Sequence, residues 1–302
     1  MIDVIDLEKH YGRKTVLDGL SFMVEPGRVT GFLGPNGAGK STTMRLIAGL
    51  DAPTRGRATV AGHPYAEHDA PLRTLGMLLD AGAAHPGRTA RAHLRALAAA
   101  AGISRRRVDE LLTMVGLEAV ATSRVGRFSL GMRQRLGIAS ALLGDPAAVM
   151  LDEPVNGLDP DGVRWLRELL RQLAAEGRTV LVSSHPMSEM TLTADHLVII
   201  GRGRLIADEP LEEFVRRAGG GVVEVRSPDA TALRDLLVGP GVTVSAREAG
   251  LLEVSGLDAE VIAARAAGAG VPVHGLTPRA ASLEQAFMDL TRDHSEYRSV
   301  RS

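Results

Sequence analysis

Cysteine is missing from the 302 residues of this chain. Its absence excludes disulfide bonds and thiolate metal sites, and it is consistent with a reducing cytosol. Long apolar runs are missing too, because no stretch approaches the roughly 18 uninterrupted apolar residues of a membrane-spanning helix. The first residues include acidic ones, whereas a secretory signal begins with basic and then apolar residues. We therefore expect a soluble, cytoplasmic chain that meets a membrane only through a partner.

An excess of charge of either sign is also lacking. The chain has 35 lysine and arginine residues against 36 aspartate and glutamate residues, which gives a net charge of -1. A broad electrostatic attraction to nucleic acid or to anionic lipid is therefore not indicated. Hydrophobic residues make up 45% of the sequence, enough for a substantial core. A chain of this length can form one large domain and a smaller one.

A glycine-rich segment, GPNGAGKST, lies between an apolar run that ends at Leu33 and a helical pattern that includes Met44. Strand, glycine-rich loop and helix in this order are the context of a phosphate-binding G-x-x-x-x-G-K-[ST] loop. Glycines permit the positive φ angles that turn successive N–H groups toward one anion, and the helix N-terminus adds positive potential. The segment therefore predicts a nucleoside triphosphate site. Its residues are Gly34, Pro35, Asn36, Gly37, Ala38, Gly39, Lys40, Ser41 and Thr42.

Within this loop and after a later strand, the sequence offers the groups that ATP hydrolysis needs. Lys40 can reach the β- and γ-phosphates, and the Ser41 hydroxyl can ligate Mg²⁺. The apolar run 147–151 predicts a buried strand that ends in Asp152 and Glu153. A carboxylate at the carboxyl end of such a strand can orient the water shell of Mg²⁺ beside the loop. Glu153 is a candidate to polarise the attacking water.

Two other features are open to more than one interpretation. Tyr11 either stacks its ring on a purine or packs within a hairpin. Ser129 is a natural N-cap for a helix over 130–143, and Gly131 removes a side chain from its first turn. That helix start is either a second phosphate contact or an ordinary capped helix, and the residues alone favour the ordinary helix.

Segments around the acidic strand complete the expected core. The β-branched run 179–183 predicts a strand, and the histidine that follows it, His185, would point toward the γ-phosphate. Asn156–Pro160 forms a turn that opens a helix. Helical periods earlier in the chain predict a helical block between strands. Helices are expected over residues 89–101, 104–115 and 130–143, and further strands over 57–61 and 74–79.

Together these motifs resemble the nucleotide-binding subunits of ATP-binding cassette (ABC) transporters. Tyr11 and the segments GPNGAGKS, FSLGM, VMLDEP, NGLD and SSHPMSE follow one another in the order and at the spacing of that family. The resemblance covers residues 1–215. It implies an α/β fold, a RecA-like P-loop core with an antiparallel β subdomain and with a helical subdomain inserted at about residues 86–145.

The resemblance also implies a mechanism that needs two copies of the chain. ATP and Mg²⁺ on Lys40 and Ser41 of one copy would be covered by Ser129 and Gly131 of the other, in a head-to-tail homodimer. This implication replaces the ordinary reading of the capped helix.

Further roles follow from the same resemblance. Glu153 would act as the base, His185 would contact the γ-phosphate, and Asp159 would link the two sites. Tyr11 takes the place of the family's aromatic residue beside the nucleotide. Closing of the dimer would drive a separate permease, which would hold the chain at the inner face of the cell membrane.

Two departures from the family pattern refine this expectation. The usual signature LSGGQ is replaced by FSLGM, so that Leu130 and Met132 stand where a glycine and a glutamine are expected. FSLGMRQRL is similar to the subgroup that exports antibiotics, drugs, peptides and lipid-linked compounds. Asp80 stands where the family has a glutamine that binds Mg²⁺ and senses the permease. A carboxylate there could still reach the metal.

After Gly219–Gly221 the composition changes, and a second domain is expected over residues 222–292, with a flexible tail at 293–302. The pattern predicts two β-α-β halves, a small α+β ferredoxin-like domain. We expect it to stabilise the dimer or contact the permease rather than bind a regulatory molecule. Strands are expected over residues 222–226, 242–246, 251–254 and 271–275, and helices over 230–237, 259–267 and 282–290.

Two alternatives are weighed against an exporter ATPase. Some importer ATPases carry a regulatory tail, but the altered signature and Asp80 argue against that reading. A soluble ABC ATPase acting on ribosomes or DNA is a different class of protein. Members that act in translation usually carry two cassettes, and members that act on chromosomes carry long coiled coils. Neither feature is present here, and the near-neutral charge also argues against nucleic acid.

Overall fold

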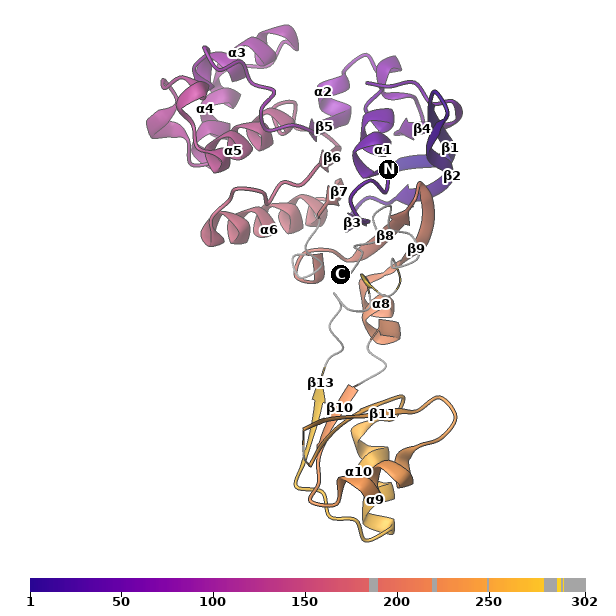
Figure 1. The fold of residues 1–302 in the computed structure, drawn as a ribbon. Helices are drawn as coiled ribbons and strands as arrows, with labels where there is room; N and C mark the ends of the chain where they lie inside the picture. The colour runs from indigo at the N-terminus through magenta and orange to yellow at the C-terminus, as the bar shows by residue number, and fades with distance from the viewer. Residues whose placement is uncertain (185–189, 219–221, 249, 280–286, 289, 291–302) are drawn as a thin grey trace. The chain divides into compact units, whose positions relative to one another are not determined.

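A computed structural model describes residues 1–184, 190–218, 222–248, 250–279, 287, 288 and 290 of the chain. The chain divides into two compact units, residues 1–211 and residues 212–290. Each unit has its own fold and is described by itself (Figure 1).

The centre of the first unit is a six-stranded sheet in the order β5-β6-β7-β3-β8-β9. Neighbouring strands are parallel except for β9, which pairs antiparallel with β8. Strands β3, β6, β7 and β8 are buried along their whole length, as expected for parallel strands covered on both faces. The strands are β3 (Val29–Leu33), β5 (Leu75–Leu78), β6 (Ala148–Leu151), β7 (Thr179–Ser183), β8 (His196–Gly201) and β9 (Arg204–Pro210).

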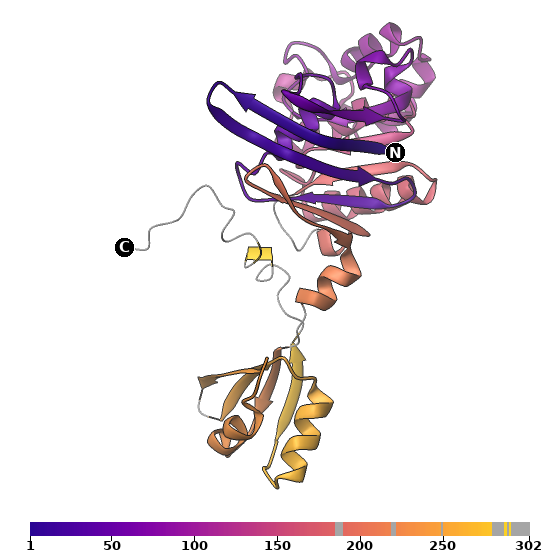
Figure 2. The same ribbon diagram turned by 90° about the vertical axis from the view of Figure 1, so that its right-hand side faces the viewer.

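A second sheet in this unit is antiparallel, in the order β2-β1-β4. Figure 2 shows its two long N-terminal strands side by side in indigo. Their apolar faces share one core with β3 and with helix α1 (Lys40–Ile47), where the rings of Phe22 and Phe32 stack with centroids 5.3 Å apart. This core holds β3 and α1 in place and so fixes both ends of the loop that joins them. The strands are β1 (Ile2–Tyr11), β2 (Lys14–Val24) and β4 (Arg55–Val60).

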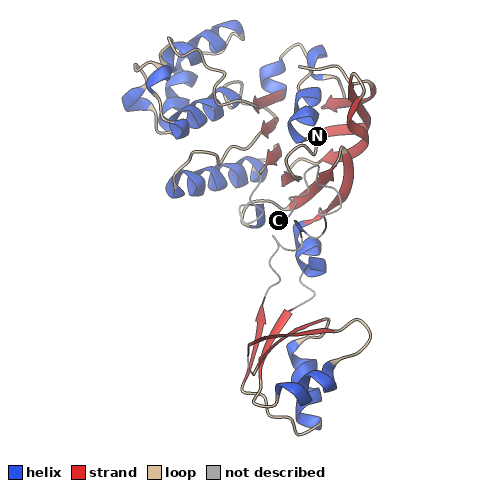
Figure 3. Ribbon diagram, in the orientation of Figure 1, coloured by secondary structure: helices blue, strands red, loops and turns tan. Residues whose placement is uncertain are grey.

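A group of helices lies between β5 and β6 in the chain and is drawn in blue in Figure 3. Each long helix begins at a hydroxyl side chain that accepts a backbone N–H: Thr89 from Ala92 at 3.1 Å, Ser104 from Arg107 at 3.3 Å and Ser129 from Met132 at 3.2 Å. Such caps satisfy N–H groups that have no partner within the helix. The predicted helical block is therefore present. Its helices are α3 (Ala90–Ala100), α4 (Arg105–Met114) and α5 (Leu130–Ala141), with 3₁₀ turns at Glu118–Val120 and Val125–Arg127.

The turn after Asp159 opens the expected helix, α6 (Pro160–Ala175). Several other elements of the first unit were not predicted. Helix α2 (Pro71–Thr74) and a 3₁₀ turn at Tyr65–Glu67 were not expected. The hairpin of β8 and β9 was not expected either, although it completes the central sheet.

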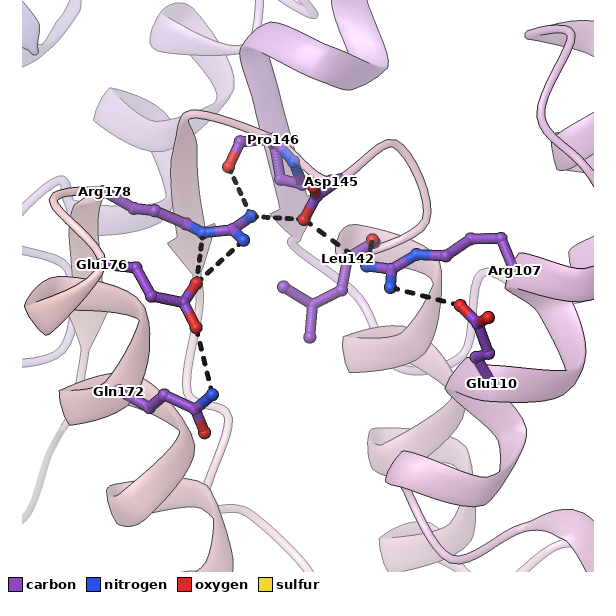
Figure 4. A network of polar contacts seen from close by, with 8 residues as sticks. All are labelled: Arg107, Glu110, Leu142, Asp145, Pro146, Gln172, Glu176 and Arg178. Carbon is purple, nitrogen blue, oxygen red and sulfur yellow. Dashed lines mark hydrogen bonds and ion pairs between the residues drawn. The ribbon is translucent and has the colours of Figure 1, made fainter.

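A polar network connects α4 with the loop before β6 and with the turn before β7 (Figure 4). The carboxylate of Asp145 lies 2.8 Å from Arg178 and 3.6 Å from Arg107. Arg107 also donates to the carbonyl of Leu142 at 3.1 Å, and Arg178 donates to that of Pro146 at 3.0 Å. Several charges that share partners hold a loop better than an isolated surface pair does. The network therefore fixes the connection between α5 and β6, the strand that leads to Asp152 and Glu153.

The close approach of α5 to β5 yields a stability prediction. A Cβ at Gly76 would overlap the carbonyl oxygen of Ala141 at the end of α5. Gly76→Ala should therefore push the helix from the sheet and destabilise the first unit by about 1–3 kcal/mol, the usual cost of overpacking. Gly268→Ala is the control, because a Cβ there meets open space. Urea unfolding should show a lower midpoint for Gly76→Ala alone, and equal midpoints would contradict the packing described.

The second unit contains a four-stranded antiparallel sheet in the order β11-β12-β10-β13. Two helices pack their apolar residues against it, in a core that includes Val225, Leu233, Val254 and Ile262. The elements after α8 (Leu211–Ala218) follow the predicted β-α-β-β-α-β order. They are β10 (Val222–Arg226), α9 (Ala230–Leu237), β11 (Thr243–Glu248), β12 (Leu251–Ser255), α10 (Ala259–Gly268) and β13 (Gly275–Arg279).

The last strand of this unit differs from its predicted position. The sequence predicts a strand over 271–275, but β13 begins at Gly275 and includes Pro278. Val271 and Val273 still pack against the core, without pairing as a strand. The helix expected over 282–290 falls largely outside the described residues, as does the tail 293–302.

Candidate nucleotide-binding site

The glycine-rich loop joins the end of β3 to the start of α1 in a conformation that requires glycine. Gly37 has φ 81° and Gly39, the N-cap of α1, has φ 107°, both in the left-handed region. A Cβ at Gly34 would lie 2.5 Å from the carbonyl oxygen of Ile200, and a Cβ at Gly39 would lie 2.6 Å from the Leu17 side chain. The loop therefore follows the path expected of a phosphate-binding segment.

A cavity of about 480 Å³ opens above this loop. Most of the predicted loop residues line it, together with Glu153 from the segment after β6. Sequence reasoning missed two contributions, the start of β2 and the turn between β8 and β9. The lining residues are Lys14, Thr15, Val16, Asn36, Gly37, Ala38, Gly39, Lys40, Ser41, Thr42, Glu153 and Arg202.

Lys40 is buried at the base of the cavity. Its Nζ donates to the carbonyl oxygen of Gly34 at 2.6 Å and lies 3.4 Å from that of Pro35. Burial lowers the pKa of the Lys40 ammonium, and the nearby carboxylates of Glu153 and Asp152 oppose this shift. The hydrogen bonds of this buried cation go to neutral carbonyl oxygens. A phosphate is therefore a favourable partner for it, because the phosphate brings negative charge.

Asp152 lies at the centre of a chain of hydrogen bonds beside the cavity. Its Oδ2 accepts from the Ser41 hydroxyl at 2.8 Å, and its Oδ1 accepts from the Ser183 hydroxyl. Strand β7, which ends in Ser183, lies between β6 and β3 in the sheet. Sequence reasoning predicted Ser41 and Asp152 but missed Ser183, which the strand order brings to the other oxygen of the Asp152 carboxylate.

The oxygen atoms of Ser41 and Asp152 form a donor set that fits Mg²⁺. This ion usually takes one or two carboxylates and keeps waters and substrate phosphates as its other ligands. Within the part of the chain that the structure describes, no group of three or more histidine, cysteine, aspartate or glutamate side chains is arranged for a metal. The site therefore suits an ion that arrives with a nucleotide better than one held by protein alone.

Glu153 lines the cavity from a strained backbone position. Its φ of 49° is in the left-handed region, which is uncommon for a residue other than glycine. The backbone is held from both sides, because its N–H donates to Ser183 Oγ at 2.9 Å and its carbonyl accepts from Gln134 Nε2 at 3.1 Å. Strain retained in this way is typical of functional positions. His185, which is predicted to contact the γ-phosphate, lies outside the described residues.

Asp80 and Tyr11 are among the predicted residues that do not line the cavity. The carboxylate of Asp80 accepts the N–H of Gly82 at 2.7 Å and lines a different cavity, beside α3 and α5. The structure therefore does not bring it to Ser41 and Asp152. Tyr11 is 49% exposed, and its hydroxyl donates to Asp51 at 3.1 Å. It is not among the described residues that line the 480 Å³ cavity, and its contact with a purine stays a prediction.

Ser129 and Gly131, which are expected to face a partner's nucleotide, lie on segments that pack close to Asp159, which is expected to link the two sites. Ser129 caps α5, and Asp159 caps α6 by accepting the N–H of Gly162 at 2.9 Å. Gly131 is so close to the NGLD turn that a Cβ would lie 2.5 Å from the carbonyl oxygen of Gly157. None of Ser129, Gly131 and Asp159 is among the described residues lining the 480 Å³ cavity. The start of α5 and the NGLD turn thus form one packed surface.

Comparison with known proteins assigns this arrangement to a family. Residues 17–156 match the family model described as ABC transporter. The bacitracin transport ATP-binding protein BcrA of Bacillus licheniformis is 41% identical over 220 residues, which is 72% of each chain. This chain belongs to the ABC transporter ATP-binding family. This ABC protein is therefore an ATPase.

Other similar proteins each cover between 69% and 72% of the ABC protein. The lantibiotic transport ATP-binding protein SrtF of Streptococcus pyogenes is 36% identical, over 69% of this chain and 90% of its own. A solved ATP-binding subunit of an ABC transporter has a TM-score of 0.66 and 34% identity, over 72% of this chain and 93% of its own. A dimeric bacterial ABC transporter cassette has a TM-score of 0.64 and 26% identity, over 70% and 99%.

Two comparisons extend to the second unit. Residues 221–284 match a domain of unknown function, DUF8746. The Nod factor export ATP-binding protein I of Burkholderia orbicola is 37% identical over 303 residues, which is 96% of each chain, so this similarity includes the second unit. Among the described residues of the ABC protein, none of the helices is long and apolar enough to cross a membrane.

Proposed function

We propose that this chain is the ATP-hydrolysing subunit of an exporter and that it drives a separate membrane permease. The similarity to proteins named for bacitracin transport, lantibiotic transport and Nod factor export carries this proposal. Antibiotics, drugs, peptides and lipid-linked compounds are the proposed classes of cargo. The permease would hold the subunit at the inner face of the cell membrane.

Two copies of the subunit would associate head to tail, so that each ATP lies between Lys40 and Ser41 of one copy and Ser129 and Gly131 of the other. Two observations support this arrangement. Ser129 and Gly131 do not line the cavity of their own chain among its described residues, and a similar cassette of known structure is a dimer. Asp159, at the start of α6, would lie where the two sites meet.

Within each site, Lys40 would bind the β- and γ-phosphates, and Glu153 would accept a proton from the attacking water. The Ser41 hydroxyl and the Asp152 carboxylate would hold Mg²⁺, which when bound neutralises charge on the phosphate oxygens. His185 is proposed to contact the γ-phosphate. ATP would close the dimer because its γ-phosphate contacts both copies, and hydrolysis would release it.

A second cavity supports the contact with a permease. It has a volume of about 430 Å³ and lies beside β5, α3 and α5, where Leu78, Leu97 and Leu136 give it an apolar lining. Leu97 is 36% exposed in the isolated chain. Asp80 lines the same cavity, so we propose that it contacts the permease rather than the metal. The second unit is proposed to add to the dimer or to the permease contact.

Coexpression with a permease from a neighbouring gene tests the proposal. The subunit should appear in the membrane fraction and copurify with the permease in detergent. Leu97→Glu should reduce copurification at least about tenfold, because a buried carboxylate without a partner opposes the contact. It should leave the ATPase activity of the isolated subunit unchanged.

The matched control is Leu205→Glu, on β9, at a residue of similar exposure that does not line this cavity. It should copurify as the unmodified chain does. If the chain never associates with membranes when the permease is present, the proposed transport function is wrong. Equal copurification of both variants would instead place the contact elsewhere.

A further inference from the structure

The turn between β8 and β9 carries an arginine in an unfavourable conformation. Gly201 and Arg204 pair across the hairpin, and the two central residues, Arg202 and Gly203, have φ 48° and 75°. Positive φ at both central positions defines a type I′ turn, in which asparagine, aspartate or glycine is preferred at the first of them. Arginine is not among these preferred residues, so the conformation of the turn does not explain its presence there.

The turn is fixed against the glycine-rich loop and the start of β2. Gly203 donates its N–H to the carbonyl oxygen of Ala38 at 3.0 Å and accepts the N–H of Asp18 at 3.0 Å. A Cβ at Gly203 would overlap the carbonyl oxygen of Val16. The position of the neighbouring Arg202 is therefore set by contacts with the elements that form the nucleotide cavity.

Arg202 changes the charge of that cavity. The lining contains three cationic side chains, Lys40, Lys14 and Arg202, against the carboxylate of Glu153. Lys14 and Arg202 come from elements that carry none of the nucleotide-binding motifs, the start of β2 and the β8–β9 turn. A guanidinium presents several N–H donors in one plane and matches two phosphate oxygens at once.

We propose that Arg202 is a further phosphate-binding residue of this subunit, which contacts the phosphate chain of the bound nucleotide, with Lys14 as a second cation. The β8–β9 turn places Arg202 in the lining of the cavity, apart from the segments that carry the nucleotide-binding motifs, and a strained backbone is typical of functional positions. The inference concerns ATP binding and does not depend on the direction of transport or on the permease.

The same turn provides a matched control. Arg204 lies two residues later, is mostly exposed, and donates to Asp18 at 2.6 and 2.9 Å. It does not line the cavity. Replacing either arginine with asparagine removes one positive charge from the same hairpin, but only the change at 202 removes a cavity-lining side chain. Asparagine also suits the type I′ turn, so Arg202→Asn should fold at least as stably as the unmodified chain.

Calorimetric titration of the full chain with ATP and with inorganic tripolyphosphate tests the proposal. Arg202→Asn should weaken the binding of both ligands by about 10–100-fold, the range for lost hydrogen bonds to a charged group. Arg204→Asn should change each affinity by less than about twofold, as expected for a screened surface charge. The unfolding midpoint of Arg202→Asn without nucleotide should not fall.

Three results would overturn the assignment. Unchanged ATP affinity in Arg202→Asn would mean that the guanidinium does not touch the nucleotide. An equal loss of ATP affinity in Arg204→Asn would mean that the effect comes from the overall positive charge of the hairpin and not from a contact made by Arg202. A loss for ATP without a loss for tripolyphosphate would mean that Arg202 contacts the base or the sugar and not the phosphates.

Discussion

Replacing Glu153 with glutamine should slow ATP hydrolysis by about 10²–10⁴-fold, the range that a positioned general base contributes. Glutamine has nearly the same shape, but it cannot accept a proton from the attacking water. Because Ser183 and Gln134 hold the backbone of residue 153 from both sides, the new amide should occupy the place of the carboxylate. Steady-state release of phosphate measures the effect.

ATP binding should survive this change, since the variant removes a negative charge from a cavity that receives phosphates. The ATP-bound dimer should therefore accumulate, and size-exclusion chromatography with ATP should detect it. The control is Glu168→Gln, at an exposed carboxylate on α6, which should keep normal turnover and a normal dimer fraction. Should Glu153→Gln hydrolyse ATP at the normal rate, the role of Glu153 as base is wrong.

Replacing Lys40 with methionine should weaken ATP binding by about 30–4,000-fold, which corresponds to the roughly 2–5 kcal/mol lost when one partner of a buried charged contact is removed. Methionine nearly fills the volume of the lysine stem but has no charge. Burial already lowers the pKa of the Lys40 ammonium, so the fold holds this cation at a cost. The variant should therefore unfold at about the same temperature as the unmodified chain when no nucleotide is present.

The unfolding temperatures of Lys40→Met and of the unmodified chain should differ when ATP is added. At an ATP concentration 100 times the dissociation constant of the unmodified chain, binding stabilises the fold by about 2.7 kcal/mol. A 100-fold weaker variant gains only about 0.4 kcal/mol under the same conditions. Arg106→Met, which removes an exposed charge from α4, should keep the full shift in unfolding temperature. An equal ATP-dependent shift in Lys40→Met would refute the phosphate contact.

The chemistry of the site could be predicted because it is carried by short segments at strand ends. Lys40 and Ser41 follow β3, and Asp152 and Glu153 follow β6. The carboxyl ends of parallel strands meet at one edge of a sheet, so residues far apart in the chain converge there. The hydrogen bond from Ser41 to Asp152 is the outcome of that rule. Strand β7 and the elements β10 and α9 also have the predicted bounds.

What the sequence could not supply is the order of the strands. Strand β8 pairs with β3, so the turn after β8 reaches the glycine-rich loop and brings Arg202 to the cavity. Strand β5 lies at the other edge, with β6 and β7 between it and β3. Asp80, which follows β5, is therefore directed to a different cavity. No local pattern distinguishes a strand beside β3 from one three places away.

The displaced strand in the second unit has a local cause. Val271 and Val273 alternate as a strand would, whereas Pro278 lacks the N–H that a central strand needs. The sheet order makes β13 an edge strand, where a proline is tolerated. The two valines instead fill the core from the preceding loop. The alternation of apolar residues indicates here which residues are buried. The edge position of β13 determines which residues pair as a strand.

Because Gly131 packs tightly against Gly157, the residue at either position limits which residues the other position can accept. A Cβ at Gly131 would meet the carbonyl of Gly157, and a Cβ at Gly157 would meet the Leu130 side chain. Either substitution strikes the same pair of segments, so the penalties of the two single variants should not add in the double variant. Related proteins with another residue at one of these glycines are therefore expected to differ in the other segment as well.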